Sequence, residues 1–380
     1  MFDFSRENKS LLASWWRNID KTILFLILLL FFLGLFFSFS STSSVIGEKL
    51  NKESYFFFLK HLIFVGIALI IIFFLSLQKR EIIKTYLPYF FLISLLLLFL
   101  VPFIGIEVKG AKRWLDLPFL PRFQPIEILK PFFILILAQI ISSQIIHNLY
   151  RKYFYTLVLL LVVLFLLIIQ PDLGQSVLLF SSWLIMLFSS GINFIILVTF
   201  FLVCVLIFVS ILFFFPNKFG YILFRLKSFI DPTKGENYQS EKALEAIKSG
   251  GFTGRGLGEG VLKDRVPEAH TDYIFAIIAE EFGAILILLL IIIFLFFSYK
   301  VLHKLLDEKD EYTKLVLVGL ISLLLIQTFI HIGVNIRLLP TTGITLPFLS
   351  YGGSSIVGNA IIAGLILNLT KKIPLNQDSL

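Results

Sequence analysis

Val266-Pro-Glu-Ala-His-Thr-Asp-Tyr-Ile-Phe-Ala-Ile-Ile-Ala-Glu-Glu-Phe-Gly283 decides how this chain is arranged, because it joins a long polar segment to an apolar run that continues to Tyr299. It holds five ionisable side chains: Glu268, His270, Asp272, Glu280 and Glu281. A carboxylate near hydrocarbon is costly unless it has a partner, water or a function, so the cluster predicts a functional site. The alternative is that Thr271 or Asp272 only caps a helix that begins at Tyr273.

The apolar run after this cluster is too long for one membrane crossing. A continuous helix over 273–299 would extend about 40 Å, against about 30 Å of hydrocarbon. We therefore expect a break near Glu280, Glu281 and Gly283, with Asp272 on an outer piece that faces the preceding loop. Spacings of four residues would place Asp272, Ala276 and Glu280 on one helix face.

Composition identifies the solvent of most of the chain as lipid. The sequence is 58% hydrophobic and 15% charged, with 44 Phe among 380 residues, and its mean hydropathy is +0.93. These values are typical of a polytopic membrane protein. Its single cysteine, Cys204, excludes an intramolecular disulfide and a thiolate metal cluster.

The apolar runs predict an all-α bundle of about ten transmembrane helices. They lie near 22–42, 55–78, 86–104, 125–145, 155–169, 175–191, 195–215, 282–300, 315–335 and 355–370. The first run is longer than a signal-peptide core, so we expect it to be retained as a span. No linker divides the chain, which predicts a single integral membrane domain over 1–380, with one large outer loop over 216–281 between spans seven and eight.

Lysine and arginine are more frequent in the segments that are cytoplasmic if the N-terminus lies inside. We therefore expect both termini in the cytoplasm. Within the outer loop, 224–230 is typical of a helix on lipid headgroups and 239–248 of an exposed amphipathic helix. The Gly-rich segment 249–260 lacks P-loop spacing. It is either flexible or allows close approach to a ligand beside Arg255 and Lys263.

A basic loop, Lys109-Gly-Ala-Lys-Arg-Trp114, extends to Arg122 and continues into a predicted helix start at Gln124-Pro-Ile-Glu-Ile-Leu-Lys130. The loop either only contacts lipid headgroups or forms a cationic funnel for an anionic one. Glu127 and Lys130 stand three residues apart on one helix face. They form either an ion pair that locks the bundle or part of that funnel.

Two other segments connect predicted helices through non-helical backbone. Gln170-Pro-Asp-Leu-Gly174 predicts a turn in which Asp172 caps the sixth span, with a direct chemical role as the alternative. The segment 337–355 holds two prolines and three glycines, so it cannot be a continuous helix. Irregular backbone at membrane depth must be covered by protein or water. The segment therefore either lines the same outer site or is an ordinary connection.

Five blocks in this order resemble the SEDS family (shape, elongation, division, sporulation) of membrane glycosyltransferases. The blocks are 109–114, 124–130, 170–174, 267–273 and 339–355, which together extend over nearly the whole chain. Glu-Ala-His-Thr-Asp and Thr345 in Gly-Ile-Thr-Leu-Pro are most similar to the division branch; Arg337 and Thr341-Thr342 depart from it, and the elongation branch is the alternative.

The resemblance implies an enzyme that polymerises lipid II, the lipid-linked precursor of peptidoglycan, outside the bacterial cytoplasmic membrane and at the division septum. It also implies a class B penicillin-binding transpeptidase and other division proteins as partners, and no nucleic acid. The essential acidic residue of the family maps to Asp272. Glu127 and Lys130 map to a functional block, whereas the basic loop maps by motif alone.

The expected chemistry agrees with this resemblance. A carboxylate at Asp272 could take the proton of an acceptor hydroxyl as a general base, with Glu268 and Glu280 the next candidates. The leaving pyrophosphate is already stable as an anion, so cations can replace a general acid. Candidate substrate-binding residues are Glu127, Lys130, Lys112, Arg113, Arg255, His270 and Ser350. We expect no tightly bound cofactor, although a divalent cation, Mg²⁺ or Mn²⁺, could accompany the pyrophosphate.

Two other classes of protein fit part of the sequence. A transporter that flips lipid II would also need a cationic cavity and broken helices, but with polar residues through the inner half of the membrane as well. Here intramembrane charges cluster toward the outer half, where Lys60 and His61 also lie in span two. A non-catalytic division scaffold would not explain the outer charge cluster.

Overall fold

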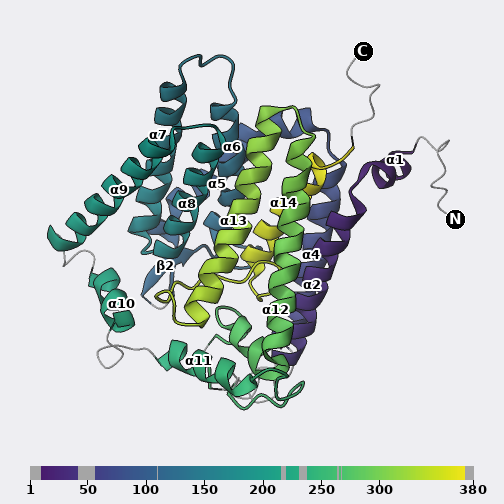
Figure 1. The fold of residues 1–380 in the computed structure, drawn as a ribbon, viewed down its shortest axis with the longest axis vertical. Helices are drawn as coiled ribbons and strands as arrows, with labels where there is room; N and C mark the ends of the chain where they lie inside the picture. The colour runs from purple at the N-terminus through teal and green to yellow at the C-terminus, as the bar shows by residue number, and fades with distance from the viewer. Residues whose placement is uncertain are drawn as a thin grey trace.

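The computed structural model describes residues 10–41, 56–108, 110–214, 220–230, 238–262, 265–266 and 268–372. Ten helices of 17 residues or more run alongside one another in the described residues (Figure 1). They are α2 (Lys21–Ser41), α4 (Phe56–Leu77), α5 (Arg80–Ile104), α6 (Pro125–Ile141), α7 (Leu149–Ile169), α8 (Leu173–Ser189), α9 (Phe194–Phe214), α12 (Ile274–His303), α13 (Glu311–Asn335) and α14 (Gly353–Leu369).

These helices occupy the ten predicted apolar runs, so the all-α prediction is confirmed. Seven of them are long and apolar enough to cross a membrane: α2, α4, α5, α7, α9, α12 and α13. The other three, α6, α8 and α14, have 17 residues each. At 1.5 Å per residue such a helix extends about 25 Å, and the non-helical segments beside it complete the depth of the bundle.

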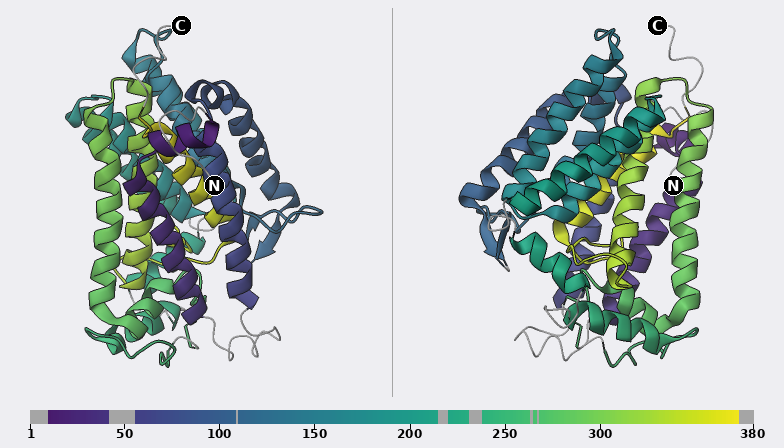
Figure 2. Two further views of the ribbon diagram at one scale, coloured as in Figure 1. Left: turned by 90° about the vertical axis from the view of Figure 1, so that its right-hand side faces the viewer. Right: turned by 60° about the vertical axis from the view of Figure 1, so that its left-hand side comes forward.

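The core of the bundle is formed by α6, α13 and α14. Nearly every residue of α14 is buried, and it packs against α4 and α6. Gly358 allows this packing, because a Cβ there would collide with the Glu127 carbonyl of α6. By contrast, α9 lies on the outside of the bundle, and its main packing partner among the described helices is α8 (Figure 2).

The described segments outside these ten helices divide between two opposite faces of the bundle (Figure 1). We call one the loop face: it carries β1 (Ile106–Val108), β2 (Ala111–Trp114), α10 (Gly220–Ile230), α11 (Tyr238–Gly250), and segments 170–172, 251–262, 268–273 and 336–352. The other is the terminal face, with α1 (Leu11–Asn18), η2 (Lys304–Leu306) and turns 78–80 and 370–372. All segments predicted to be outer loops, where described, lie on the loop face.

Two helices of the loop face were predicted from the sequence, and one hairpin was not. The helices expected over 224–230 and 239–248 are present as α10 and α11. The basic loop is an antiparallel hairpin of β1 and β2, which the apolar pattern did not predict. Lys109 and Lys263 lie outside the described residues.

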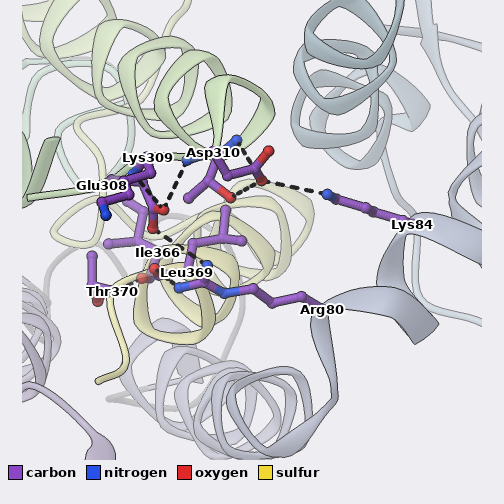
Figure 3. A network of polar contacts seen from close by, with 9 residues as sticks. Arg80, Lys84, Glu308, Lys309, Asp310, Ile366, Leu369 and Thr370 are labelled. Carbon is purple, nitrogen blue, oxygen red and sulfur yellow. Dashed lines mark hydrogen bonds and ion pairs between the residues drawn. The ribbon is translucent and has the colours of Figure 1, made fainter. Parts of the chain in front are cut away.

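Ion pairs between side chains join the helix ends at the terminal face (Figure 3). Arg80 Nη1 lies 3.3 Å from Glu308 Oε2, and Arg80 Nη2 donates to the Leu369 carbonyl at 2.6 Å. Lys84 Nζ lies 3.4 Å from Asp310 Oδ2, and the same carboxylate caps α13. These contacts connect the start of α5 to the turn between α12 and α13 and to the end of α14.

Candidate functional site

Asp272 lies in a short non-helical segment that leads into α12. Glu268 has φ 58°, and its carbonyl accepts hydrogen bonds from the amides of Thr271 and Tyr273, so the chain turns sharply before the helix. The helix begins at Ile274, and Tyr273 at the N-cap position makes no side-chain capping hydrogen bond. The alternative in which Thr271 or Asp272 caps a helix from Tyr273 therefore does not hold. The expected helix face shared by Asp272, Ala276 and Glu280 is also wrong, because Asp272 lies before the helix.

The start of α12 is instead capped from the end of α13. Asn335 is fully buried, and its Oδ1 accepts a hydrogen bond from the Ala276 amide at 3.2 Å. Its Nδ2 donates to the backbone carbonyls of Asp272 at 3.1 Å and His331 at 2.8 Å. One side chain thus fixes the backbone of Asp272 relative to two helices. Sequence reasoning missed Asn335; the signal was an amide at the end of an apolar span, where burial requires hydrogen-bond partners.

The segment 336–352 holds the Asp272 segment from the other side. Ser350 Oγ donates to the Thr271 carbonyl at 2.7 Å and accepts from the Leu346 amide at 2.8 Å. Gly343 lies so close that a Cβ there would be 3.5 Å from Asp272 Oδ2. The predicted juxtaposition of this segment with Asp272 is confirmed, and the structure brings together Asp272, His270 and Ser350.

Beneath segment 336–352 lies a buried chain of polar contacts. Gln327 Nε2 donates to the Thr345 carbonyl at 3.0 Å, and its Oε1 accepts from Lys130 Nζ at 3.1 Å. Lys130 also lies 2.8 Å from Glu127 Oε2, and Gln175 Nε2 donates to Glu127 Oε1 at 2.6 Å. The Lys130 side chain is 1% exposed. Glu127 and Lys130 therefore form a buried ion pair. Through Gln327 the pair supports segment 336–352 on its side toward the bundle core.

One cation of the hairpin, Arg113, contacts the turn before α8. Arg113 donates from Nε to the Gln170 carbonyl at 3.2 Å and from Nη2 to the Pro171 carbonyl. Arg113 Nη1 also lies 3.8 Å from Asp172 Oδ1, while the Asp172 side chain accepts from the Gln175 amide as the N-cap of α8. The predicted cap at Asp172 is confirmed. Lys112 is exposed on β2.

The Gly-rich segment pairs with a break in α12 at the predicted place. Gly283 has φ 75°, a conformation that favours glycine. The carbonyls of Glu280 and Glu281 accept hydrogen bonds from the amides of Arg255 and Gly256, both at 3.0 Å, and the Ala284 amide donates to Gly251 at 2.9 Å. The glycines therefore allow close approach to α12.

Two candidates from the sequence lie at this break rather than beside Asp272. Glu280 is fully buried, and its Oε1 accepts the amides of Val261 and Leu262, each at 2.9 Å. These bonds hold the loop in place. Because the Glu280 carboxylate is buried and already bonded, Glu280 is no longer a candidate for the general base. The Arg255 side chain is exposed and its Nε donates to the Ser249 carbonyl at 3.4 Å.

Among the residues that the structure describes, no group of three or more His, Cys, Asp or Glu side chains could hold a metal ion. The Asp272 side chain is half-buried, and its Oδ2 lies next to Gly343 of segment 336–352. Such a setting can orient a carboxylate toward a polar ligand at the loop face.

Comparison with known proteins places the chain among bacterial membrane proteins of the cell cycle. Residues 20–373 match the FTSW_RODA_SPOVE family, described as "Cell cycle protein". The chain is 31% identical over 371 residues to the probable peptidoglycan glycosyltransferase FtsW of Caulobacter vibrioides (strain NA1000 / CB15N), covering 98% of this chain and 94% of the relative. It is 34% identical over 368 residues to the protein of the same name in Coxiella burnetii (strain RSA 493 / Nine Mile phase I), covering 94% and 96%.

A solved structure shows the same fold. A chain from the study "Structural coordination of polymerization and crosslinking by a peptidoglycan synthase complex" superposes with a TM-score of 0.75 at 25% identity, covering 93% of this chain and 97% of that one.

Proposed function

This chain belongs to the FtsW/RodA/SpoVE family of cell cycle proteins, and we propose that it is a multi-pass membrane peptidoglycan glycosyltransferase that polymerises lipid II into glycan strands. The observation that carries the proposal is the placement of Asp272. It lies outside the helix on the loop face, with its backbone fixed by Asn335 and its segment fastened by Ser350. The resemblance to the relatives named FtsW supports a role in septal synthesis.

The loop face is the outer face in this proposal, and both termini lie in the cytoplasm of the bacterial cell. The concentration of lysine and arginine on the terminal side favours that orientation by the positive-inside rule. Lipid II would then reach Asp272 from the outer leaflet, where the glycan strand grows.

Asp272 acts as the general base in the proposed reaction. Its carboxylate takes the proton from the acceptor sugar hydroxyl as the oxygen attacks the anomeric carbon of the donor. The bond from that carbon to the pyrophosphate oxygen breaks, and the undecaprenyl pyrophosphate leaves as an anion. Asn335 and Ser350 do not touch the reacting atoms; they are positioning residues that act through the backbone.

Cations near the loop face stabilise the departing pyrophosphate. Lys112 and Arg255 are exposed there, whereas Arg113 is engaged with segment 170–172 and Lys130 is buried. We therefore assign direct electrostatic stabilisation first to Lys112, because Arg255 lies at the α12 break and not beside Asp272. A divalent cation would arrive with the substrate, and none of the steps above depends on it.

Polymerisation of labelled lipid II by the purified protein tests the function, with and without a class B penicillin-binding transpeptidase as the proposed partner. A lipid II transporter, the alternative class, would make no glycan strands in this assay. The likeness to a chain of a peptidoglycan synthase complex supports the choice of partner.

Substitution of Asp272 tests its role in the same assay. Asp272→Asn keeps the shape but not the basicity, so we expect a loss of about 10²–10⁴ in rate with normal melting and partner binding. Asp272→Glu keeps the carboxylate but displaces it, with a loss on the order of 10². Near wild-type polymerisation by Asp272→Asn would move the assignment to Glu268.

A further inference from the structure

Two polar side chains at the loop-face end of α4 have no part in the site described above. Lys60 and His61 follow the first residue of the helix, Phe56, by about one turn. The His61 side chain is 0% exposed, and neither ring nitrogen has a hydrogen-bond partner among the described residues. A buried polar group without a partner lowers stability, so the fold alone gives no reason for an imidazole at this position.

Aromatic rings connect His61 to the Asp272 segment. The Tyr351 ring lies 6.0 Å from the His61 ring and 5.8 Å from the His270 ring, measured between centroids. The Phe57 ring lies 4.4 Å from His270 and 5.7 Å from Tyr351. The Tyr351 amide also donates to the His270 carbonyl at 3.0 Å. Three separate elements, α4, segment 268–273 and segment 336–352, therefore meet at these rings.

The same group of rings carries a positive charge at its edge. Lys60 is exposed, and its Nζ lies 4.5 Å from the centroid of the Phe56 ring. Phe57, His270 and Tyr351 are each partly exposed, so the rings form a surface and not part of the closed core. An ammonium beside partly exposed aromatic faces suits a ligand that is both apolar on one side and anionic at one end.

We propose that Lys60, His61, Phe57 and Tyr351 form a binding subsite for the phosphorylated sugar of the lipid-linked substrate, an inference that rests on the function proposed above. The rings of Phe57 and Tyr351 pack against the apolar face of the sugar. Movement of the Tyr351 ring lets the buried imidazole of His61 form a hydrogen bond with a sugar hydroxyl or amide. Lys60 pairs with a phosphate oxygen in a charge-assisted hydrogen bond.

The His61→Phe variant separates binding from folding, because it removes the polar atoms and keeps an aromatic ring. We expect its melting temperature to equal or exceed that of the wild type, since no hydrogen bond within the described residues is lost. We expect KM for lipid II to rise about tenfold with little change in kcat, the result for a lost ground-state contact. His303→Phe, at an exposed histidine on the terminal face, is the control for the substitution itself, and it should change neither quantity.

Two further variants sharpen the test. His61→Gln keeps a donor and an acceptor, so it should recover part of the affinity that His61→Phe loses. Lys60→Met removes an exposed charge without touching the core, and should raise KM and weaken its dependence on salt concentration.

Three results would contradict the proposed subsite. They are a wild-type KM in a folded His61→Phe variant, failure of that variant to fold, which would make the imidazole structural, and an unchanged KM in Lys60→Met. If the wild type polymerises lipid II while these variants behave like it, only the subsite is refuted. A wild type that makes no glycan refutes the proposed function instead.

Discussion

The two faces of the bundle use several of their polar side chains differently. At the terminal face, ion pairs such as Lys304 with Asp20 and Arg80 with Glu308 join one helix end to another. At the loop face, Asn335, Ser350 and Gln327 form hydrogen bonds with the backbone of non-helical segments.

The difference follows from what each face must hold in place. Helix ends joined by short turns satisfy most of their own backbone groups. At the terminal face, ion pairs therefore serve to hold one helix end against another. Irregular backbone at membrane depth has amides and carbonyls that water does not reach, and side chains must satisfy them. Side chains bonded to the backbone also fix the position of every neighbouring side chain, which a catalytic carboxylate requires.

The largest effect on stability should come from Lys130. Lys130→Met leaves Glu127 buried without its charged partner, which should cost about 3–5 kcal/mol. The double variant Lys130→Met with Glu127→Gln removes both charges and should recover most of the loss. Melting of the purified variants measures this.

Polymerisation by the same double variant then decides what the Lys130 charge does. We expect nearly normal activity if Lys130 serves the loop face only through the ion pair. A stable double variant without activity would contradict this division, because the charge itself would act on the substrate.

Substitution of two buried asparagines by leucine, one at each face, compares the faces directly. Asn335→Leu removes the hydrogen bonds to the Ala276 amide and the Asp272 carbonyl, and displacement of Asp272 should lower the polymerisation rate about 10²-fold. Asn368 is the matched control at the terminal face, where it donates to the Leu75 and Gln78 carbonyls at 2.9 and 2.7 Å. Asn368→Leu should lower the melting temperature by a similar amount yet leave the rate within about twofold, since no reacting group moves.

This comparison fails if both asparagine variants lose activity in proportion to stability. In that case both faces would only hold the fold together, and Asn335 would have no specific connection to Asp272.

The smallest effect should come from Asp20 and Lys304, whose charged atoms lie 2.7 Å apart. Partial burial opposes ionisation of Asp20, but the hydrogen bonds from Lys304 and from the amide of Ile23 outweigh it and hold the pKa of Asp20 below its usual range. The contribution of the pair is therefore present above about pH 4 and is lost as the pH falls through the lowered pKa. A double-mutant cycle with Asp20→Asn and Lys304→Met should give about 0.2–1 kcal/mol at neutral pH, with unchanged polymerisation.

The helices could be predicted from the sequence because apolar length alone reports a membrane span. The break at Gly283 was predictable as well, since acidic residues and a glycine interrupt an apolar run. The β1–β2 hairpin was missed because its short strands carry charged residues at Lys112 and Arg113 and show no apolar alternation.

The site was only partly predictable for a different reason. Ser350 is conspicuous as a polar residue in a segment that cannot be a continuous helix, and Asp272 as a carboxylate beside a long apolar run. The partners that hold them, Asn335 and Gln327, lie within apolar spans and are distant in sequence. Their roles depend on which backbone groups the fold leaves without a partner, and a local pattern does not contain that information.

Labelling from outside the cell tests the central claim, that the loop face with Asp272 is the outer, catalytic face. In a Cys204→Ser background, Lys248→Cys places a thiol on α11 and Lys309→Cys places one at the terminal face, both at exposed positions. A membrane-impermeant maleimide should label Lys248→Cys in intact cells and Lys309→Cys only after permeabilisation. Labelling of Lys309→Cys alone in intact cells would contradict both the orientation and the proposed reaction.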